Sequence, residues 1–137
     1  MRHMSFAQKK LSLLALATCL LALIVILLGA YTRLTNAGLS CPDWPHCYGY
    51  LTAPHTSSQI QAATKAYPGT PVETTKAWTE MVHRYAAGGE GLLILALVIL
   101  IGWRKPVSLV LIALLSTQIL LGMLTVTRQL NPLIVLS

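Results

Sequence analysis

Long apolar runs separated by polar segments dominate the pattern of this chain of 137 residues. Two of them, residues 11–30 and 107–126, carry no formally charged side chain. At about 1.5 Å of rise per residue, a helix of either length crosses the roughly 30 Å hydrocarbon core of a bilayer. The pattern therefore predicts membrane-spanning helices at about 11–31 and 106–127.

A third apolar run, residues 92–103, is too short to span a membrane alone. It becomes long enough when it extends toward the N-terminus, and we place this helix at about 75–103. The extension puts Glu90 inside the span, and Glu80 and His83 near its outer end. Ionisable groups at such positions are costly, so we expect them to face protein, a cofactor or water and to serve chemistry.

The loop between the first two spans, at about 32–74, has two halves of different composition. The half that ends at Tyr50 is dense in Cys, Pro, Trp, Tyr and Gly, which indicates a compact, ordered turn. The other half predicts a short helix around 57–66. Thr74 or Thr75 is then the expected N-cap of the second span.

Composition agrees with an integral membrane protein, because 55% of the residues are hydrophobic, 10% are charged and the mean hydropathy is +0.65. The fold class that follows is all-α, a polytopic membrane helical bundle in a single domain over residues 1–137. Cations flank the spans at Arg2, Lys9, Lys10, Arg104 and Lys105. By the positive-inside rule, the N-terminus is cytoplasmic and the loop 32–74 is extracytoplasmic. The net charge of +6 is thus a topology signal, and it gives no reason to expect a nucleic-acid partner.

The three cysteines fit this topology. Cys41 and Cys47 enclose two prolines, which favour a turn that brings its ends together, and an oxidising compartment then favours a disulfide. Two alternatives are a pair of free thiols and a metal site with His46 or His55, although the spacing is not that of a usual zinc site. Cys19, inside the first span, is expected to be a small buried apolar residue.

The helical period places the ionisable groups of the second span on one stripe. At about 100° per residue, Glu80, His83 and Glu90 share it with the small residues Ala87 and Gly91. Space beside an imidazole suits a large flat group, and His83 would then be an axial ligand to heme iron. The alternatives are a partly hydrated interfacial histidine and a stripe of small residues used for close helix packing.

Other polar residues on the helices have simpler interpretations. A Glu-x-x-His pair also occurs in di-iron bundles, but this chain offers too few further carboxylates for such a site. In the last span, Ser116, Thr117 and Gln118 are attributed to interhelical hydrogen bonds.

Several motifs together resemble the heme A synthase family. They are GAYTRLTNAGLSCPDWP at residues 29–45, EMVHR at 80–84, and Gln118, Leu121-Gly122, Thr125-Val126 and Asn131-Pro132. The motifs follow the family's order over nearly the whole chain. Their combination is specific, although no single motif is.

The resemblance implies an inner-membrane enzyme that oxidises a methyl group of heme O to the formyl group of heme A, the prosthetic group of terminal oxidases. Family members have eight spanning helices in two four-helix halves, each with paired histidines for a heme. One half holds the substrate heme and the other holds a heme b that passes electrons. This chain would be an incomplete N-terminal half, with three spans and the start of a fourth, and heme b would belong to the missing half.

By position in the family motifs, His83 would be an axial ligand to the substrate heme iron. Glu80 would be the catalytic group, with a charge or proton role beside the reacting methyl. Arg33 or Arg84 would pair with heme propionates, and lipid phosphate is the alternative partner for both. Cys41 and Cys47 match the family's outer-loop cysteine pair.

The sequence stops at Ser137, before any second histidine of the heme site. We therefore expect that this polypeptide alone does not make heme A. The partners implied are heme O, membrane lipid, heme O synthase, oxidase assembly factors and further copies of the chain. Alternative functions are a non-catalytic heme-binding or electron-transfer subunit and a structural or assembly protein.

Overall fold

The computed structural model describes residues 5–127, and all its regular elements are helices. They are α1 (Phe6–Leu34), α2 (Ser57–Ala66), α3 (Thr74–Ile101) and α4 (Pro106–Thr127). Within the described residues, α1, α3 and α4 are long and apolar enough to cross a membrane. The predicted all-α membrane bundle is therefore confirmed. Arg2 and the expected start of a fourth spanning helix after Asn131 lie outside the described residues.

α1 extends beyond the predicted 11–31 at both ends. At its start, the Ser5 side chain accepts a hydrogen bond from the Gln8 N–H, and the Gln8 side chain accepts one from the Ser5 N–H. This capping box satisfies backbone donors that would otherwise be unpaired at a helix start. Capping and not hydropathy therefore decides where α1 begins.

The ends of α3 follow from backbone chemistry as well. Its N-cap is Glu73, which makes no side-chain capping bond, so the predicted cap at Thr74 or Thr75 is wrong and both threonines lie inside the helix. The helix stops at Ile101 because Gly102 adopts φ +100°, a conformation that favours glycine. α4 then begins with Pro106, which lacks the N–H that a first helical position would leave unpaired.

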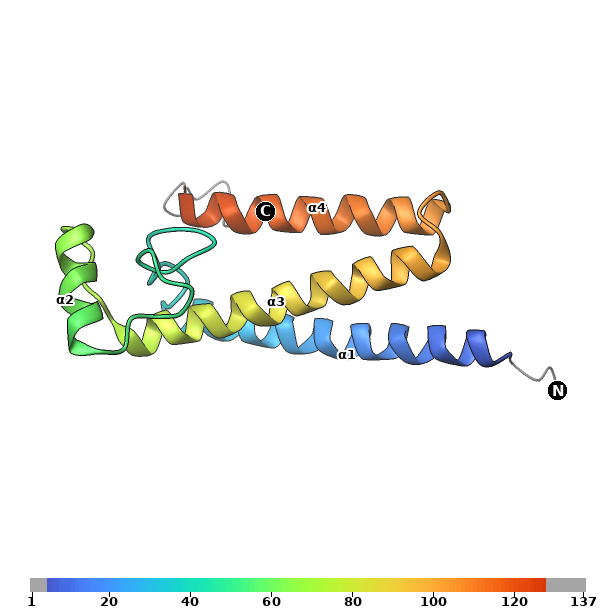
Figure 1. Ribbon diagram of the computed structural model, residues 1–137, viewed down its shortest axis with the longest axis horizontal. Coiled ribbons are helices and arrows are strands. Elements are labelled where there is room, and N and C mark those ends of the chain that lie inside the picture. Colours follow the sequence, from blue (N-terminus) through green and yellow to red (C-terminus); the bar gives the residue numbers. More distant parts are fainter. Residues whose placement is uncertain (1–4, 128–137) are drawn as a thin grey trace.

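The spanning helices form a layer with α3 in the middle (Figure 1). α1 and α4 each pack on α3, and the backbones of the described parts of α1 and α4 do not approach each other closely. Both neighbours pack beside glycines of α3: a Cβ at Gly89 would lie 3.8 Å from Leu21 of α1 and one at Gly91 would lie 3.6 Å from Leu115 of α4, which are ordinary van der Waals distances. Part of the α3 surface is therefore covered by neither α1 nor α4.

The main buried cluster of the described residues lies where the loop covers the start of α3, and not between the spanning helices. The cluster of buried residues comprises Cys41, Cys47, Tyr48, Ala53, Ala63, Ala77 and Met81. Large apolar side chains on the spanning helices are mostly exposed, as expected of surfaces that face lipid. Cys19 is also exposed, contrary to the prediction that it is buried.

Candidate functional site

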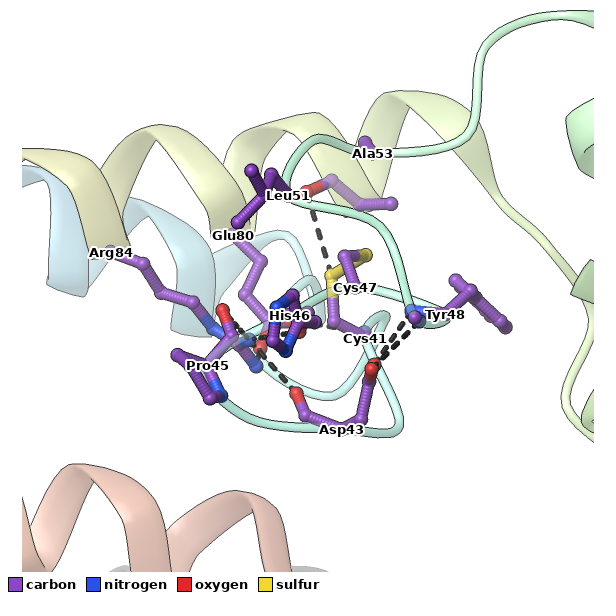
Figure 2. The surroundings of a disulfide bond; sticks show 12 residues. Cys41, Asp43, Pro45, His46, Cys47, Tyr48, Leu51, Ala53, Glu80 and Arg84 are labelled. Atoms are coloured by element: carbon purple, nitrogen blue, oxygen red, sulfur yellow. Dashed lines mark hydrogen bonds and ion pairs between the residues drawn. A yellow bond between two sulfur atoms is a disulfide. The ribbon is translucent and has the colours of Figure 1, made fainter.

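A closed turn forms the outer part of the site. Cys41 and Cys47 are joined by a disulfide, with a Cα–Cα distance of 4.7 Å, so the free-thiol alternative is wrong (Figure 2). In the described residues, no three His, Cys, Asp or Glu side chains form a group that could hold a metal ion, so the alternative with His46 or His55 has no support. We call residues 41–47 the disulfide turn.

Asp43 stabilises the backbone that directly follows the disulfide turn. Its carboxylate accepts the backbone N–H of Tyr48 at 2.6 Å and that of Gly49 at 2.7 Å. Both of these residues have positive φ, +54° at Tyr48 and +79° at Gly49. The two short, charge-assisted bonds stabilise a backbone path that is otherwise unfavourable for tyrosine.

Glu80 points from α3 into the disulfide turn (Figure 2). Glu80 is 4% exposed, and its Oε2 accepts a hydrogen bond from the Cys41 backbone N–H at 2.9 Å. Oε1 pairs with the guanidinium of Arg84, one helical turn further along α3. Both carboxylate oxygens therefore have protein partners.

Arg84 completes the attachment of the disulfide turn to α3. Its Nη1 donates to the backbone carbonyls of Asp43 at 2.9 Å, His46 at 2.7 Å and, more weakly, Pro45 at 3.5 Å. Its Nη2 donates to Glu80. We call this set of contacts between Glu80, Arg84 and the disulfide turn the clamp. The clamp holds segments together that are about 40 residues apart in sequence.

His83 lies outside the clamp and faces α1. A Cβ added at Gly29 would lie 3.0 Å from Cε1 of the His83 ring and 3.4 Å from Nε2, so the ring lies against the α1 backbone. The ring is half-buried, and its Nδ1 is buried without a hydrogen-bond partner in the described residues. A buried ring nitrogen without a protein partner fits a residue that can serve as a ligand.

The predicted stripe on α3 is only partly correct. Glu80 faces the disulfide turn, whereas His83 faces α1. Gly91 was expected to leave space beside the imidazole, but its open side is occupied by Leu115 of α4. Glu90 is 8% exposed, and its Oε2 has no hydrogen-bond partner in the part of the chain that the structure describes.

A cavity of about 520 Å³ lies between the end of α1 and α4. Its lining residues are Arg33, Leu114, Thr117, Gln118, Leu121, Gly122 and Thr125. Among residues 5–127 Thr117 makes no interhelical hydrogen bond, and its hydroxyl donates to the Ala113 carbonyl of its own helix at 2.8 Å. Polar residues of α4 therefore face this cavity. Arg33 is also part of its wall, whereas Arg84 belongs to the clamp.

Tyr48 links the disulfide turn to the segment before α3. Its hydroxyl donates to the Pro71 carbonyl at 3.1 Å, and its ring meets the Tyr67 ring edge-on, with centroids 5.4 Å apart. Burial raises the pKa of the Tyr48 phenol above 10.0, and the negative charge of nearby carboxylates, Glu80 first among them, raises it further.

Sequence reasoning identified Glu80, His83 and the disulfide but missed two contributors to the site. The close approach at Gly29 could have been suspected from the adjacent small residues 29 and 30 in an otherwise bulky apolar run. The sequence indicates the role of Asp43 only weakly, through the presence of a carboxylate in a Pro-rich turn.

The sequence of the chain matches those of known proteins. Residues 12–136 match the sequence model of the Cytochrome oxidase assembly protein family. The chain is 45% identical to the Heme A synthase of Shewanella oneidensis over 124 residues, which are 88% of this chain and 38% of the relative. It is 27% identical to the Heme A synthase of Lysinibacillus sphaericus over 137 residues, which are 92% of this chain and again 38% of the relative.

The chain thus spans about 38% of the length of these curated relatives. No solved structure matches it significantly. The family match covers all three spanning helices almost completely, together with the disulfide turn and the clamp. The chain therefore belongs to the heme A synthase family.

Proposed function

We propose that this chain supplies the substrate-heme site of an enzyme that oxidises the methyl group of heme O to the formyl group of heme A. The observation that carries the proposal is His83, held against Gly29 of α1, with the Val25 backbone near its ring and its buried Nδ1 without a hydrogen bond of good geometry in the described residues. Imidazole is a common axial ligand of heme iron. Family membership supplies the chemical class of the substrate.

In this proposal heme O is the substrate and its iron, held by His83, supplies the redox chemistry. Glu80 acts on the reacting substituent through its charge. Positive character that develops at the methyl carbon during oxidation is stabilised by a fixed carboxylate nearby. Both Glu80 oxygens already accept hydrogen bonds, one of them from a guanidinium, which disfavours proton abstraction by this carboxylate.

Of the two arginines, Arg33 is the better candidate for the heme propionates. It lines the open cavity of about 520 Å³ between the end of α1 and α4. Arg84 is not among the residues that line this cavity and belongs to the clamp. A guanidinium at the cavity wall suits a propionate carboxylate, which it can bind through two parallel hydrogen bonds.

We also propose the orientation in a bacterial inner membrane, with the N-terminus in the cytoplasm and the disulfide turn on the outer side. The flanking cations favour it. The disulfide supports it independently, because such bonds persist in oxidising compartments. Heme b, in this proposal, belongs to parts of the enzyme that lie outside this chain.

The first test is heme binding by the full chain in lipid nanodiscs. Heme b and heme O serve as probes, and the Soret band is titrated for the wild type, for His83→Ala and for the control His55→Ala, a change in the exposed loop. We expect His83→Ala to weaken binding at least about tenfold, since it removes the iron ligand, and His55→Ala to leave it unchanged. An identical Soret band in His83→Ala and wild type would favour a purely structural role.

The second test separates an enzyme from a non-catalytic heme-binding subunit. Hemes are extracted after incubation of the reconstituted chain with heme O and an electron donor, and are analysed by mass. We expect no formyl product from this chain alone and a formyl product when the remaining part of a heme A synthase is co-expressed, lost again in Glu80→Gln. Heme that stays unmodified in the co-expressed complex would favour the non-catalytic subunit.

A further inference from the structure

We propose that Arg84 is the positioning residue of this site, and that it makes the orientation of the Glu80 carboxylate depend on closure of the disulfide turn. The inference deepens the proposed function, on which it rests only for the chemical role of Glu80. Its structural content, a mutual dependence between the carboxylate and the turn, can be tested without heme.

The contacts of the Arg84 guanidinium carry the proposal. One nitrogen reaches carbonyls on the disulfide turn and the other reaches Glu80, so a single planar group joins the two. Its donors are fixed in one plane, and a lysine ammonium on a flexible stem cannot reproduce that geometry. Arg84 is therefore suited to set an angle between two partners and not merely to neutralise a charge.

Burial makes the dependence mutual. The side chains of Arg84 and Glu80 are 13% and 5% exposed, so little water is available to replace a lost partner. Removing the guanidinium would leave Oε1 of Glu80 and the turn carbonyls without their donor. Conversely, opening the turn takes from Glu80 the Cys41 N–H and from Arg84 its carbonyl acceptors.

The position of Cys41 adds a second link. The residue that donates its N–H to Glu80 is itself one end of the disulfide. The disulfide ring thus fixes the position of the Cys41 N–H, which donates to Oε2 of Glu80. Arg84 is itself the donor to Oε1. Glu80 is held from two sides only when the turn is closed on α3.

The experiment measures how readily the disulfide is reduced in the folded, membrane-embedded chain. All variants carry Cys19→Ser, which removes the exposed free thiol. Nanodiscs are treated with dithiothreitol, and newly formed thiols are labelled with a maleimide over time. The variants are Arg84→Gln, Glu80→Gln, their combination, Arg84→Lys and the control Lys76→Gln, which breaks the exposed Lys76–Glu73 pair on the same helix.

We expect Arg84→Gln and Glu80→Gln each to speed reduction about tenfold or more, because attack on the disulfide requires the turn to leave α3 and each change removes buried charged hydrogen bonds. The double variant should be little faster than either single one, since both act through one clamp. Arg84→Lys should fall between wild type and Arg84→Gln. Lys76→Gln should stay within about twofold of wild type.

Chemical rescue separates positioning from a general loss of structure. Arg84→Ala is measured with and without millimolar ethylguanidinium, which can occupy the vacated place of the guanidinium. We expect slower reduction with the added cation in Arg84→Ala and no effect of it in Lys76→Gln. Reduction rates that Arg84→Gln leaves unchanged, independent effects of the two clamp residues, or a failure of rescue would each overturn the proposal. None of these readouts depends on heme binding, so the proposed function stands or falls separately.

Discussion

The imidazole of His83 lies so close to Gly29 that a methyl group on that glycine would come within 3.0 Å of Cε1 and 3.4 Å of Nε2. Contacts of this length are tighter than nine in ten real Cβ contacts, so the ring or the helix would have to move by a few tenths of an ångström. The absence of a side chain at Gly29 is therefore what lets α1 approach α3 at the histidine. α1 thereby limits the directions in which the candidate heme ligand can point.

Gly29→Ala should weaken heme binding. The added methyl pushes against the ring, and overpacking of this kind costs about 1–3 kcal/mol, so His83 must turn or α1 must shift. We expect an affinity for heme b at least about fivefold lower, measured by Soret titration in nanodiscs.

The matched control is Gly88→Ala on α3, where an added Cβ meets nothing within 4 Å. Alanine is the better helix former by about 1 kcal/mol, so this control should be neutral or stabilising and should bind heme as the wild type does. Equal affinities in Gly29→Ala and Gly88→Ala would show that the contact with α1 does not restrict His83.

Replacing both Cys41 and Cys47 with serine should loosen the disulfide turn without unfolding the spanning helices. The two residues are six positions apart, and closing so short a ring contributes only about 2 kcal/mol by the chain-entropy account. We expect faster limited proteolysis between residues 35 and 56, with the helix content seen by circular dichroism unchanged. Cys19→Ser is the control, and a cleavage rate in the double variant as slow as in this control would contradict the prediction.

The spans could be predicted from the sequence because length and apolarity alone decide whether a helix crosses a bilayer. Their ends could not, since these depend on local bonds such as the Ser5–Gln8 capping box and on the backbone conformation of Gly102. For the same reason the cap expected at Thr74 or Thr75 was wrong, as Glu73 holds that position without a side-chain bond.

The candidate site was only partly predictable. The motif identified Glu80 and His83, and helical periodicity placed them on one stripe, but periodicity describes a single helix and not its neighbours. Glu80 turns toward Cys41, which is 39 residues away in sequence, and His83 turns toward Gly29. Which neighbour each side chain meets depends on how the loop folds back and how α1 packs, and one helix does not encode either.

Tyr48 should make the stability of the disulfide turn sensitive to alkaline pH. Burial raises the pKa of its phenol above the ordinary 10.0, so the folded state favours the neutral form. This stabilisation is complete below pH 10 and is lost as the pH rises through the raised pKa. In wild type, a tyrosinate absorbance titration should show a late component that accompanies faster proteolysis of the loop.

Tyr48→Phe is the test of that assignment. It keeps the edge-on contact with Tyr67 but removes the hydrogen bond to Pro71, which should lower stability by about 1 kcal/mol at neutral pH. The late component should lose the share of Tyr48, while Tyr67, whose pKa burial also raises, still contributes to it. Tyr31→Phe, at an exposed position on α1, is the control, and a late component of unchanged amplitude in Tyr48→Phe would assign it to another tyrosine.

Glu90→Leu should stabilise the folded chain. Glu90 is 8% exposed, its Oε2 has no hydrogen-bond partner in the described residues, and no cation there forms a salt bridge with it. An unsatisfied buried polar group costs about 1–3 kcal/mol, and leucine fills a similar volume without that cost. We expect a higher midpoint of thermal unfolding in detergent for the heme-free chain.

The control for Glu90→Leu is Glu73→Gln, which removes one charge of an exposed pair and should change stability by less than about 0.5 kcal/mol. Repeating the measurement with heme b bound shows whether the carboxyl belongs to the site. If Glu90 contacts the bound heme or its water, leucine should raise the midpoint less in the bound state than in the free state. A lower midpoint for heme-free Glu90→Leu would contradict the prediction, because it would mean that Oε2 already has a stabilising partner.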